Sequence, residues 1–384
     1  MQIPLSRPDI TDTEIELVND VLRSPFLALG PKMVQFEEVV ASYVGRKYGV
    51  AVNSGTSGLH LLIKAYGIGE GDEVITTPFS FVASSNCILY ERARPVFVDI
   101  EPETGNIEPA LIEAAITPRT KAILPVDAFG QPARLDIIRD IARRHGLVVI
   151  EDACEALGSE YKGERTGNGS YADAAVFAFY PNKQITTGEG GLIVTDDERV
   201  AQLCRSMRNQ GRGEGGVWLN HERLGYNYRL DELSAALGVA QMGRIEEIIA
   251  KRQQVAELYN QRLAQIPGIR LPYIAPEVTR MSWFVYVIQV GVDEPVPAKQ
   301  AVLRERVMQR LQAAGIGCRP YFTPIHLQPF YRSQFGFREG DFPVTEAFGR
   351  TSIAIPFHNN LTPAEVEYVA EHLEKALREE GSRP

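Results

Sequence analysis

The chain is poor in the features that mark secreted, metal-binding or membrane-spanning proteins. Its 384 residues include four scattered cysteines without a CxxC pair, and six histidines without metal-ligand spacing. This pattern argues against a disulfide framework or a zinc site and predicts reduced thiols in a cytoplasmic protein. Apolar runs stay shorter than the roughly 18 residues of a membrane span. The first 14 residues lack the basic start and apolar core of a secretory signal.

Charge and composition exclude a further class of function. The formal net charge is −9 and there is no dense run of Lys and Arg, so a nucleic-acid partner is not expected. With 44% hydrophobic and 23% charged residues, the chain has the composition of an ordinary globular protein with a large core. Its length allows two or three domains. We expect neither a metal cofactor nor a membrane partner.

Apolar runs that alternate with helically spaced segments predict an α/β fold built on a mostly parallel sheet. The predicted strands are residues 49–53, 72–77, 94–100, 121–126, 147–153, 174–180 and 191–196, and the segments with helical spacing include 59–67, 108–116 and 135–146. Only ten residues, 181–190, separate the last two strands. A helical crossover needs more, so this pair is predicted to be antiparallel within a mixed seven-stranded sheet.

The pattern changes near residue 230, where a long helical stretch begins and runs to Pro267-Gly268. Beyond it we predict a strand over 282–290 and helices over 305–315 and 361–380. Two capping boxes, Thr11-x-x-Glu14 and Thr362-x-x-Glu365, predict the starts of the first and last helices. We therefore expect an N-terminal arm and a large domain over residues 1–250, and a smaller α/β domain over residues 251–384.

An aspartate and a lysine follow two of the predicted parallel strands. Asp152 lies at the end of strand 147–153, and Lys183 lies in the short connection after strand 174–180. Such a sheet presents its chemistry at the carboxyl ends of its strands. A lysine amine can form a Schiff base with pyridoxal 5′-phosphate (PLP), and a carboxylate can keep its ring nitrogen protonated. Taken singly, each residue is more simply a solvated surface lysine or a helix-capping aspartate. Their joint placement favours a PLP site.

Two further segments suit the same cofactor. Residues 53–58 join a strand to a helix, so the backbone N–H groups of Gly55 and Thr56 can hold a phosphate, although the pattern alone is also that of a plain helix N-cap. Residues 77–84 supply Phe79 and Phe81, either of which can stack on a pyridine ring. The alternative is that both aromatics belong to the core.

Six motifs in chain order are similar to those of the DegT/DnrJ/EryC1/StrS family of sugar aminotransferases. They are NSGTSGLHL (53–61), TPFSFVAS (77–84), EDACEALG (151–158), FYPNKQITTGEGG (179–191), LGYNYRLDELSAALG (224–238) and PYFTPIHLQPFY (320–331). The resemblance runs from IPLSRP near the start to the terminal helix. It implies the aspartate-aminotransferase-like fold, known as PLP fold type I, and PLP as the cofactor.

The resemblance also implies roles for the matching residues. Lys183 is expected to form the internal aldimine, and Asp152 to pair with the pyridinium nitrogen. Phe81, the second aromatic of its motif, is expected to stack on the ring. Gly55 and Thr56 are expected to bind the phosphate.

The resemblance also implies a contact with a partner subunit and one with the substrate, and the sequence departs from the family pattern at three positions. Asn227 is expected to reach the phosphate of the neighbouring subunit, so that a homodimer shares its active sites, and His326 is expected to lie near the substrate. Glu155 replaces a Gln or His that contacts the cofactor's 3′-oxygen, and a carboxylate there repels the phenolate unless it is protonated or turned away. Ala178 removes a phosphate-binding hydroxyl, and Asp127 stands where a His is common.

The implied reaction is a two-stage transamination. Glutamate is the expected donor, and a nucleotide-linked keto-deoxysugar aminated at C3 or C4 is the expected acceptor, with Lys183 as general acid and base. A dehydratase or another PLP enzyme of the same fold is the alternative, but the family's dehydratases carry a histidine in place of the lysine. A cysteine desulfurase needs a reactive cysteine, and Cys318 has no activating neighbours in the sequence.

A non-enzymatic nucleotide-binding or regulatory protein is a third possibility. Gly211-x-Gly213-x-x-Gly216 matches a dinucleotide fingerprint in form. The match follows a predicted helix end and precedes no helix, so we interpret it as coincidence. Residues 209–227 are instead expected to form a mobile loop near the active site.

Overall fold

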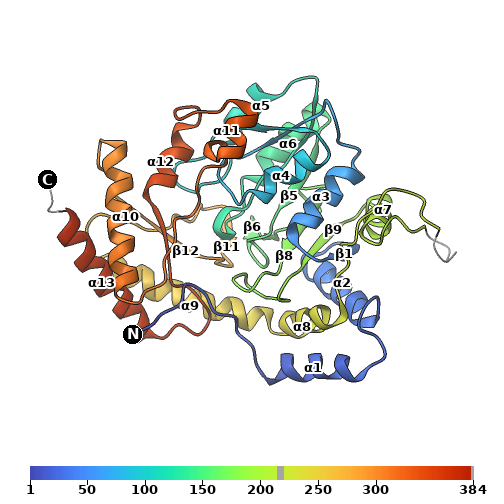
Figure 1. The fold of residues 1–384 in the computed structure, drawn as a ribbon, viewed down its shortest axis with the longest axis horizontal. Coiled ribbons are helices and arrows are strands. Elements are labelled where there is room, and N and C mark those ends of the chain that lie inside the picture. Colours follow the sequence, from blue (N-terminus) through green and yellow to red (C-terminus); the bar gives the residue numbers. More distant parts are fainter. Residues whose placement is uncertain (214–219, 382–384) are drawn as a thin grey trace.

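The computed structural model describes residues 1–213 and 220–381 (Figure 1). Within these residues seven strands form one mixed sheet, in the order β1-β9-β8-β5-β4-β2-β3. Their bounds are β1 Tyr48–Val52, β2 Glu73–Thr76, β3 Arg94–Phe97, β4 Thr120–Ile123, β5 Val148–Asp152, β8 Ala174–Ala178 and β9 Gly191–Thr195. β9 runs antiparallel to β1 and β8, and the other neighbours pair in parallel. The predicted mixed sheet and its antiparallel pair are confirmed.

The helices cover both faces of this sheet and build the C-terminal part of the chain. They are α1 Asp12–Arg23, α2 Pro31–Val44, α3 Gly55–Ala65, α4 Ala83–Tyr90, α5 Ile112–Ala115, α6 Leu135–His145, α7 Glu198–Arg208, α8 Glu232–Gly243, α9 Ile245–Leu263, α10 Pro297–Ala313, α11 Pro329–Phe335, α12 Pro343–Thr351 and α13 Pro363–Gly381. None of the helices in the described ranges is long and apolar enough to cross a membrane.

Alternate residues of the strands pack on different helical layers. Val50 and Val52 of β1 belong to a buried cluster with residues of α3, α4 and α7. Ala51, between them, belongs to a second cluster with residues of α2 and α8. In β4, toward the opposite side of the sheet from β1, Ile123 shares a buried cluster with residues of α6. Full burial of each large aliphatic side chain contributes about 1.5–3 kcal/mol, so this alternation fixes which face of every strand meets which helices.

The C-terminal part forms a smaller α/β unit. β10 Ile269–Arg270, β12 Tyr286–Val290 and β13 Ser352–Ile355 make a three-stranded antiparallel sheet, and α10 and α13 share its buried cluster. The short strands β6 Glu160–Tyr161, β7 Glu164–Arg165 and β11 Val278–Arg280 form a third sheet. Thr362 and Glu365 make the predicted capping box of α13.

The prediction of one long helix after residue 230 is wrong, because the structure has two helices there, α8 and α9. α8 ends at Gly243, and Arg244 has φ −114° and ψ 8° before α9 begins. Glycine is a weak helix former, and this residue lies at the break. The domain boundary at residue 250 remains a prediction, and that position lies inside α9.

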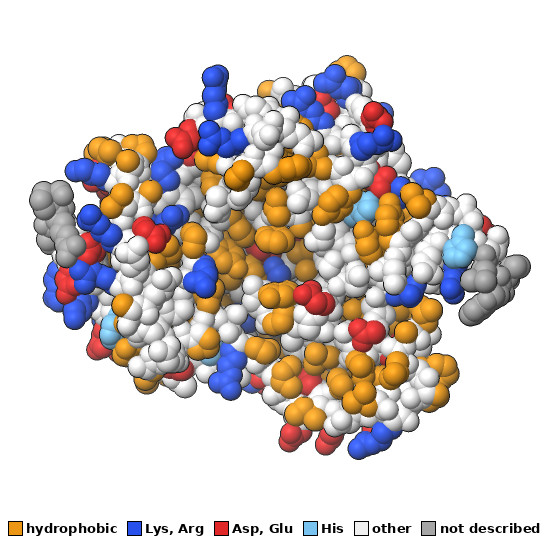
Figure 2. Space-filling model, in the orientation of Figure 1, with side chains coloured by type: hydrophobic (Ala, Val, Ile, Leu, Met, Phe, Trp, Pro, Cys, Tyr) orange, Lys and Arg blue, Asp and Glu red, His pale blue; other side chains and the backbone are white. Residues whose placement is uncertain are grey.

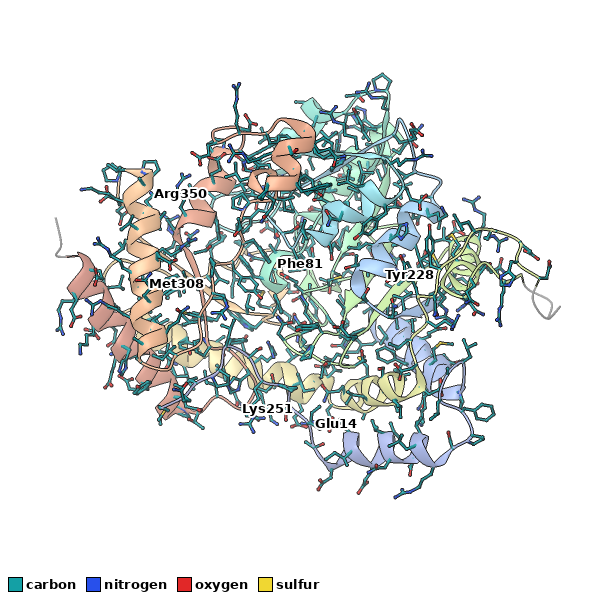
Figure 3. The ribbon with its side chains drawn as sticks, viewed as in Figure 1. Glu14, Phe81, Tyr228, Lys251, Met308 and Arg350 are labelled. Carbon is teal, nitrogen blue, oxygen red and sulfur yellow. The ribbon has the colours of Figure 1, made fainter. Side chains whose placement is uncertain are left out.

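The N-terminal arm is fastened to this break through Glu14. Thr11 N–H donates to Glu14 Oε2 at 2.7 Å, which confirms the predicted capping box of α1. Gln241 Nε2 and Arg244 Nη1 each donate to Glu14 Oε1 at 2.8 Å. Burial raises the pKa of Glu14, but these hydrogen bonds outweigh it and lower the pKa to about 2. Figure 3 labels Glu14 between α1 and α8, with Lys251 on the neighbouring α9.

We expect Glu14→Gln to lower the free energy of unfolding by about 2 kcal/mol at pH 7. Because the folded pKa lies below the unfolded value, the stabilisation from Glu14 is present above the unfolded pKa near 4.5 and is lost as pH falls toward 2. Urea unfolding at pH 7 and pH 3 should therefore show the difference between wild type and variant shrinking at the lower pH. Glu16→Gln, on the exposed side of the same helix, is the matched control. A pH-independent difference would contradict this account.

Candidate active site

A cavity of about 490 Å³ opens at the carboxyl edge of the parallel strands. Figure 2 shows a hollow near the centre of the viewed face, with hydrophobic side chains gathered around it. Six of the eight predicted site residues line the cavity: Gly55, Thr56, Phe81, Asp152, Glu155 and Lys183. The sheet thus brings together residues that are up to 128 positions apart in the sequence (183 − 55).

Asp152 is the last residue of β5, and its side chain is held in one orientation. Ser84 Oγ donates to Asp152 Oδ2 at 2.6 Å, and Cys154 N–H donates to Oδ1 at 3.2 Å. The residue is only 4% exposed. Ser84 was not predicted from the sequence, although it ends the motif that contains Phe81. Its place in the first turn of α4, facing the end of β5, is the feature that gives it this contact.

Lys183 lies between a carboxylate and an aromatic ring. Its Nζ is 3.4 Å from Glu155 Oε1 and 3.7 Å from the centroid of the Phe284 ring. Phe129 N–H donates to Glu155 Oε2 at 2.9 Å, which directs the other oxygen toward the amine. Burial raises the pKa of Glu155, and the nearby Lys183 only partly offsets this. Phe284 comes from the C-terminal unit and was not predicted.

The N-terminus of α3 forms an anion cradle at the other end of the cavity. Ser54 is the N-cap, and its Oγ accepts the Ser57 N–H at 3.1 Å. The N–H groups of Gly55 and Thr56, in the first turn, have no acceptor within the helix and point out of its positive end.

Two glycines allow the start of α3, the end of β8 and the start of β9 to approach one another closely at this cradle. A Cβ at Gly55 would lie 2.8 Å from Ala178 Cβ and from Cys154 Sγ. A Cβ at Gly191, the first residue of β9, would lie 2.5 Å from the Ser54 backbone. Both approaches are closer than real Cβ contacts allow, so either side chain would push the cradle away from the sheet.

The two aromatics of residues 77–84 have different surroundings. Phe81 is 63% exposed and lines the cavity, where Figure 3 labels it near the centre of the molecule. Phe79 is fully buried, with its ring centroid 4.9 Å from Phe348 and 5.5 Å from Phe322. Phe79 is therefore a core residue, and Phe81 is the aromatic available to a ligand.

Asn227 and His326 are not brought to the cavity of their own chain. Asn227 is exposed and pairs through its backbone with Asn209. His326 is fully buried, with Nε2 3.1 Å from Glu346 Oε1 and its ring 4.8 Å from Phe342. The turn that carries His326 packs the imidazole into an aromatic core, so it does not line this cavity, and its expected place near the substrate remains a prediction. Asn227 remains a prediction that needs a second chain.

Three other expectations from the sequence can be placed. Asp127 is fully buried and its Oδ1 accepts the Ala133 N–H at 2.9 Å, so it is not at the cavity surface. Cys318 is buried outside the cavity, and burial raises its thiol pKa to about 11, which disfavours a desulfurase. Gly211 follows α7 and not a strand, while Gly216 and residues 214–219 of the expected loop lie outside the described residues.

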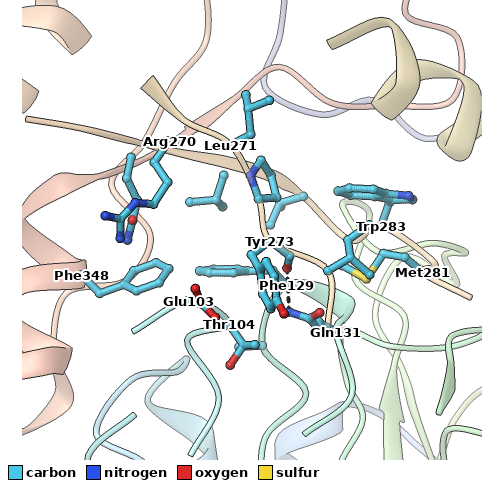
Figure 4. A pocket seen from close by; sticks show the side chains of 16 residues that line it. Glu103, Thr104, Phe129, Gln131, Arg270, Leu271, Tyr273, Met281, Trp283 and Phe348 are labelled. Atoms are coloured by element: carbon cyan, nitrogen blue, oxygen red, sulfur yellow. Dashed lines mark hydrogen bonds between the residues drawn. The ribbon is translucent and has the colours of Figure 1, made fainter. Parts of the chain in front are cut away.

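A second hollow, at the junction with the C-terminal unit, is too small for a sugar (Figure 4). Its volume is about 30 Å³, close to that of one water molecule. Phe129, Met281, Trp283 and Phe348 give it a largely apolar lining, and Gln131 Nε2 donates to the Tyr273 carbonyl at 3.1 Å. Across residues 1–213 and 220–381, no group of three or more His, Cys, Asp and Glu side chains is placed to hold a metal ion.

Comparison with known proteins decides the family. The sequence matches the DegT/DnrJ/EryC1/StrS aminotransferase family over residues 8–374. The chain belongs to this family. The family member is 39% identical to the spore coat polysaccharide biosynthesis protein SpsC of Bacillus subtilis over 379 residues, which covers 96% of this chain and 95% of SpsC. It is 38% identical to GDP-perosamine synthase of Caulobacter vibrioides over 379 residues, 98% of each chain.

A solved structure agrees with the family member over its whole length. PseC of Helicobacter pylori, an aminotransferase involved in the biosynthesis of pseudoaminic acid, superposes with a TM-score of 0.92 at 28% identity, covering 99% of this chain and 100% of PseC. The family member is a PLP-dependent sugar aminotransferase, whose substrates are an amino donor and a sugar. The predicted family, PLP transferase fold, enzyme class and cofactor are confirmed.

Proposed function

We propose that this enzyme transfers an amino group from glutamate to a nucleotide-linked keto-deoxysugar, at C3 or C4 of the ring. The observation that carries the proposal is the arrangement of Asp152, Lys183 and the α3 N-terminus around one cavity. The nucleotide link is supported by the 38% identity to an enzyme whose name specifies a GDP-linked sugar. The dehydratase alternative is disfavoured because a lysine lines the cavity.

The residues of the cavity fit PLP. The helix N-terminus suits a phosphate, Phe81 offers an aromatic face, and Asn182 Oδ1 is buried without a hydrogen-bond partner among the described residues. Asn182 is therefore available to a ligand where Ala178 offers no hydroxyl. When bound, PLP supplies an electron sink for charge that develops at the substrate carbon.

The chain's own residues supply the remaining steps. Lys183 Nζ would hold the cofactor, and its free amine is placed to carry a proton to and from the substrate carbon. Asp152 would keep a proton on the ring nitrogen, and Ser84 holds Asp152 in place. The Gly55 and Thr56 N–H groups would hold the phosphate. Phe81 and Phe284 give the cavity two aromatic side chains in its lining.

Burial favours the protonated form of Glu155 over the ionised carboxylate. Its side chain is directed by the Phe129 N–H, and burial raises its pKa. A protonated Glu155 can donate a hydrogen bond to an anionic oxygen of the cofactor, whereas an ionised one would repel it. In the proposed site, this protonated form would avoid the repulsion expected from the sequence at position 155.

A homodimer with shared active sites is part of the proposal. An apolar surface surrounds α1 and the segment after it, and hydrophobic side chains gather there at the bottom of Figure 2. Its exposed residues are Ile10, Ile15, Leu22, Phe26, Leu27, Leu29 and Val34. A patch of this extent is typical of a protein interface. Asn227, which is exposed and outside its own cavity, is then available to the partner's phosphate.

A two-stage spectroscopic experiment tests the function. We expect glutamate to abolish the visible absorbance of the holoenzyme by converting the cofactor to its amino form. A panel of keto sugars is then added, both nucleotide-linked and free. Return of the band with a nucleotide-linked keto sugar, and not with the matching free sugar, is the expected result. A band that returns equally well with free sugars would contradict the nucleotide requirement, and a band insensitive to glutamate would contradict the donor.

A further inference from the structure

A half-buried polar cluster lies between α3, α4 and the segment that carries Asn227. We call it the Glu91 cluster; its members are His60 and Lys64 of α3, Glu91 at the end of α4, and Tyr226 and Tyr228. None of them lines the cavity described above. Figure 3 labels Tyr228 beside α3 and α7.

Glu91 is the centre of this cluster. Its Oε1 accepts from Tyr226 Oη at 3.0 Å and lies 2.8 Å from His60 Nε2. Its Oε2 accepts from Lys64 Nζ at 2.8 Å. Burial lowers the pKa of His60, so the neutral ring donates from Nε2 to Glu91 and accepts at Nδ1 from Tyr228 Oη, 3.2 Å away. Every polar group at the centre is thereby satisfied.

The cluster holds the two residues that flank Asn227. Tyr226 and Tyr228 stack with ring centroids 4.9 Å apart and an interplanar angle of 11°. Side chains two positions apart in an extended segment lie on the same side, so the residue between them lies on the other. Asn227 is accordingly exposed, while both of its neighbours are half-buried.

The backbone of this segment is also tied to the chain's own phosphate cradle. Asn53 N–H donates to the Tyr228 carbonyl at 2.9 Å, one residue before the Ser54 N-cap. Tyr226 and Tyr228 donate their N–H groups to the carbonyls of Met207 and Arg208 at the end of α7. The segment is therefore fixed at its backbone by β1 and α7, and at its side chains by Glu91.

We propose that the Glu91 cluster is a positioning device, which holds Asn227 where it reaches the phosphate bound in the partner subunit's active site. The inference rests on the shared active site proposed above. It makes Glu91 a positioning residue that acts in trans: its loss should weaken cofactor binding in the opposite subunit and not in its own.

Mixed dimers separate these two cases. Chains with different affinity tags are coexpressed, and dimers carrying both tags are purified as apoenzyme. In the first dimer, one chain carries Lys183→Ala and Glu91→Gln and the other is wild type. Its only lysine-containing site depends on Asn227 of the chain with the altered cluster. In the second dimer, Lys183→Ala is on one chain and Glu91→Gln on the other, so the lysine-containing site receives Asn227 from an intact cluster.

The readout is PLP affinity, measured as the PLP fixed on Lys183 by borohydride at increasing PLP concentration. We expect the first dimer to bind PLP about tenfold more weakly than wild type, the loss of one charge-assisted hydrogen bond, and the second to bind normally. Weak binding in the second dimer alone, weak binding in both dimers, or normal binding in both dimers would overturn the positioning role.

Two further homodimers, Asn227→Ala and Glu70→Gln, complete the design. Asn227→Ala should show the same tenfold loss; if its PLP affinity is unchanged, the shared site fails and the inference with it. If Asn227→Ala weakens binding while both mixed dimers bind normally, only the positioning role fails.

Tyr226→Phe removes a single hydroxyl from the cluster, and it takes the place of Glu91→Gln in the mixed dimers if that variant does not fold. Glu70→Gln is the matched control, because Glu70 forms an exposed ion pair with Arg92 outside the cluster.

Discussion

Lys183→Ala is expected to lower kcat by about 10⁴-fold or more while leaving the protein folded. The side chain has two functions in the proposed mechanism, since Nζ both holds the cofactor and moves the proton. It does little for packing, because its main neighbours are Glu155 and the Phe284 ring. Steady-state kinetics measure the loss. Borohydride reduction of the wild-type holoenzyme followed by peptide mapping should place the label on residue 183.

Two controls make this result specific. Lys162→Ala removes a lysine that pairs with Asp136 and is 43% exposed, and it should leave kcat unchanged. Added small primary amines should restore part of the activity of Lys183→Ala, because they can supply the missing base, and they would not rescue a misfolded protein. Retained turnover in the variant, or a reduced label on another residue, would remove Lys183 from its proposed role.

Asp152→Asn is expected to lower kcat by about 10²–10³-fold, the usual cost of removing one preorganised charge from an active site. Asparagine has nearly the same shape and can still accept the hydrogen bond from Ser84. It lacks the negative charge that, in the proposed mechanism, keeps the ring nitrogen protonated. PLP should be retained, because the phosphate cradle and Lys183 are intact, so the expected signature is a fall in kcat with little change in cofactor content.

Ser84→Ala is the companion variant. Ser84 orients Asp152 through a 2.6 Å hydrogen bond without contributing charge, so we expect a loss of about tenfold. If Asp152→Asn costs no more than Ser84→Ala, orientation and not charge is the contribution of Asp152. Absorbance titration with PLP and steady-state kinetics on the same preparations distinguish these outcomes.

The parts of the site that follow directly from strand ends can be predicted from the sequence. Asp152 and Lys183 follow buried strands, and in a parallel sheet such positions meet at one edge. The antiparallel pairing of β8 and β9 follows from the length of their connection. These inferences need only local patterns and the geometry of a sheet.

Contacts between distant elements could not be predicted in this way. Phe284 approaches Lys183 only because the C-terminal unit packs against the large sheet, and no local pattern encodes that approach. The His326 motif carries no sign of which side of its turn is buried, so the burial of the imidazole beside Glu346 and Phe342 could not be predicted. The contact of Arg244 with Glu14 of the N-terminal arm, at the break between α8 and α9, likewise joins elements that are distant in the sequence.

The close approach of Gly55 and Gly191 has a consequence for how this enzyme can diversify. Both positions are closed to any larger residue by neighbouring atoms that belong to the cradle or its supports. Gly67 and Gly146, by contrast, have open space around them, and only their backbone conformation restricts them. Substitutions that adapt the enzyme to a new sugar acceptor are therefore expected at the rim of the cavity, while Gly55 and Gly191 are expected to stay unchanged.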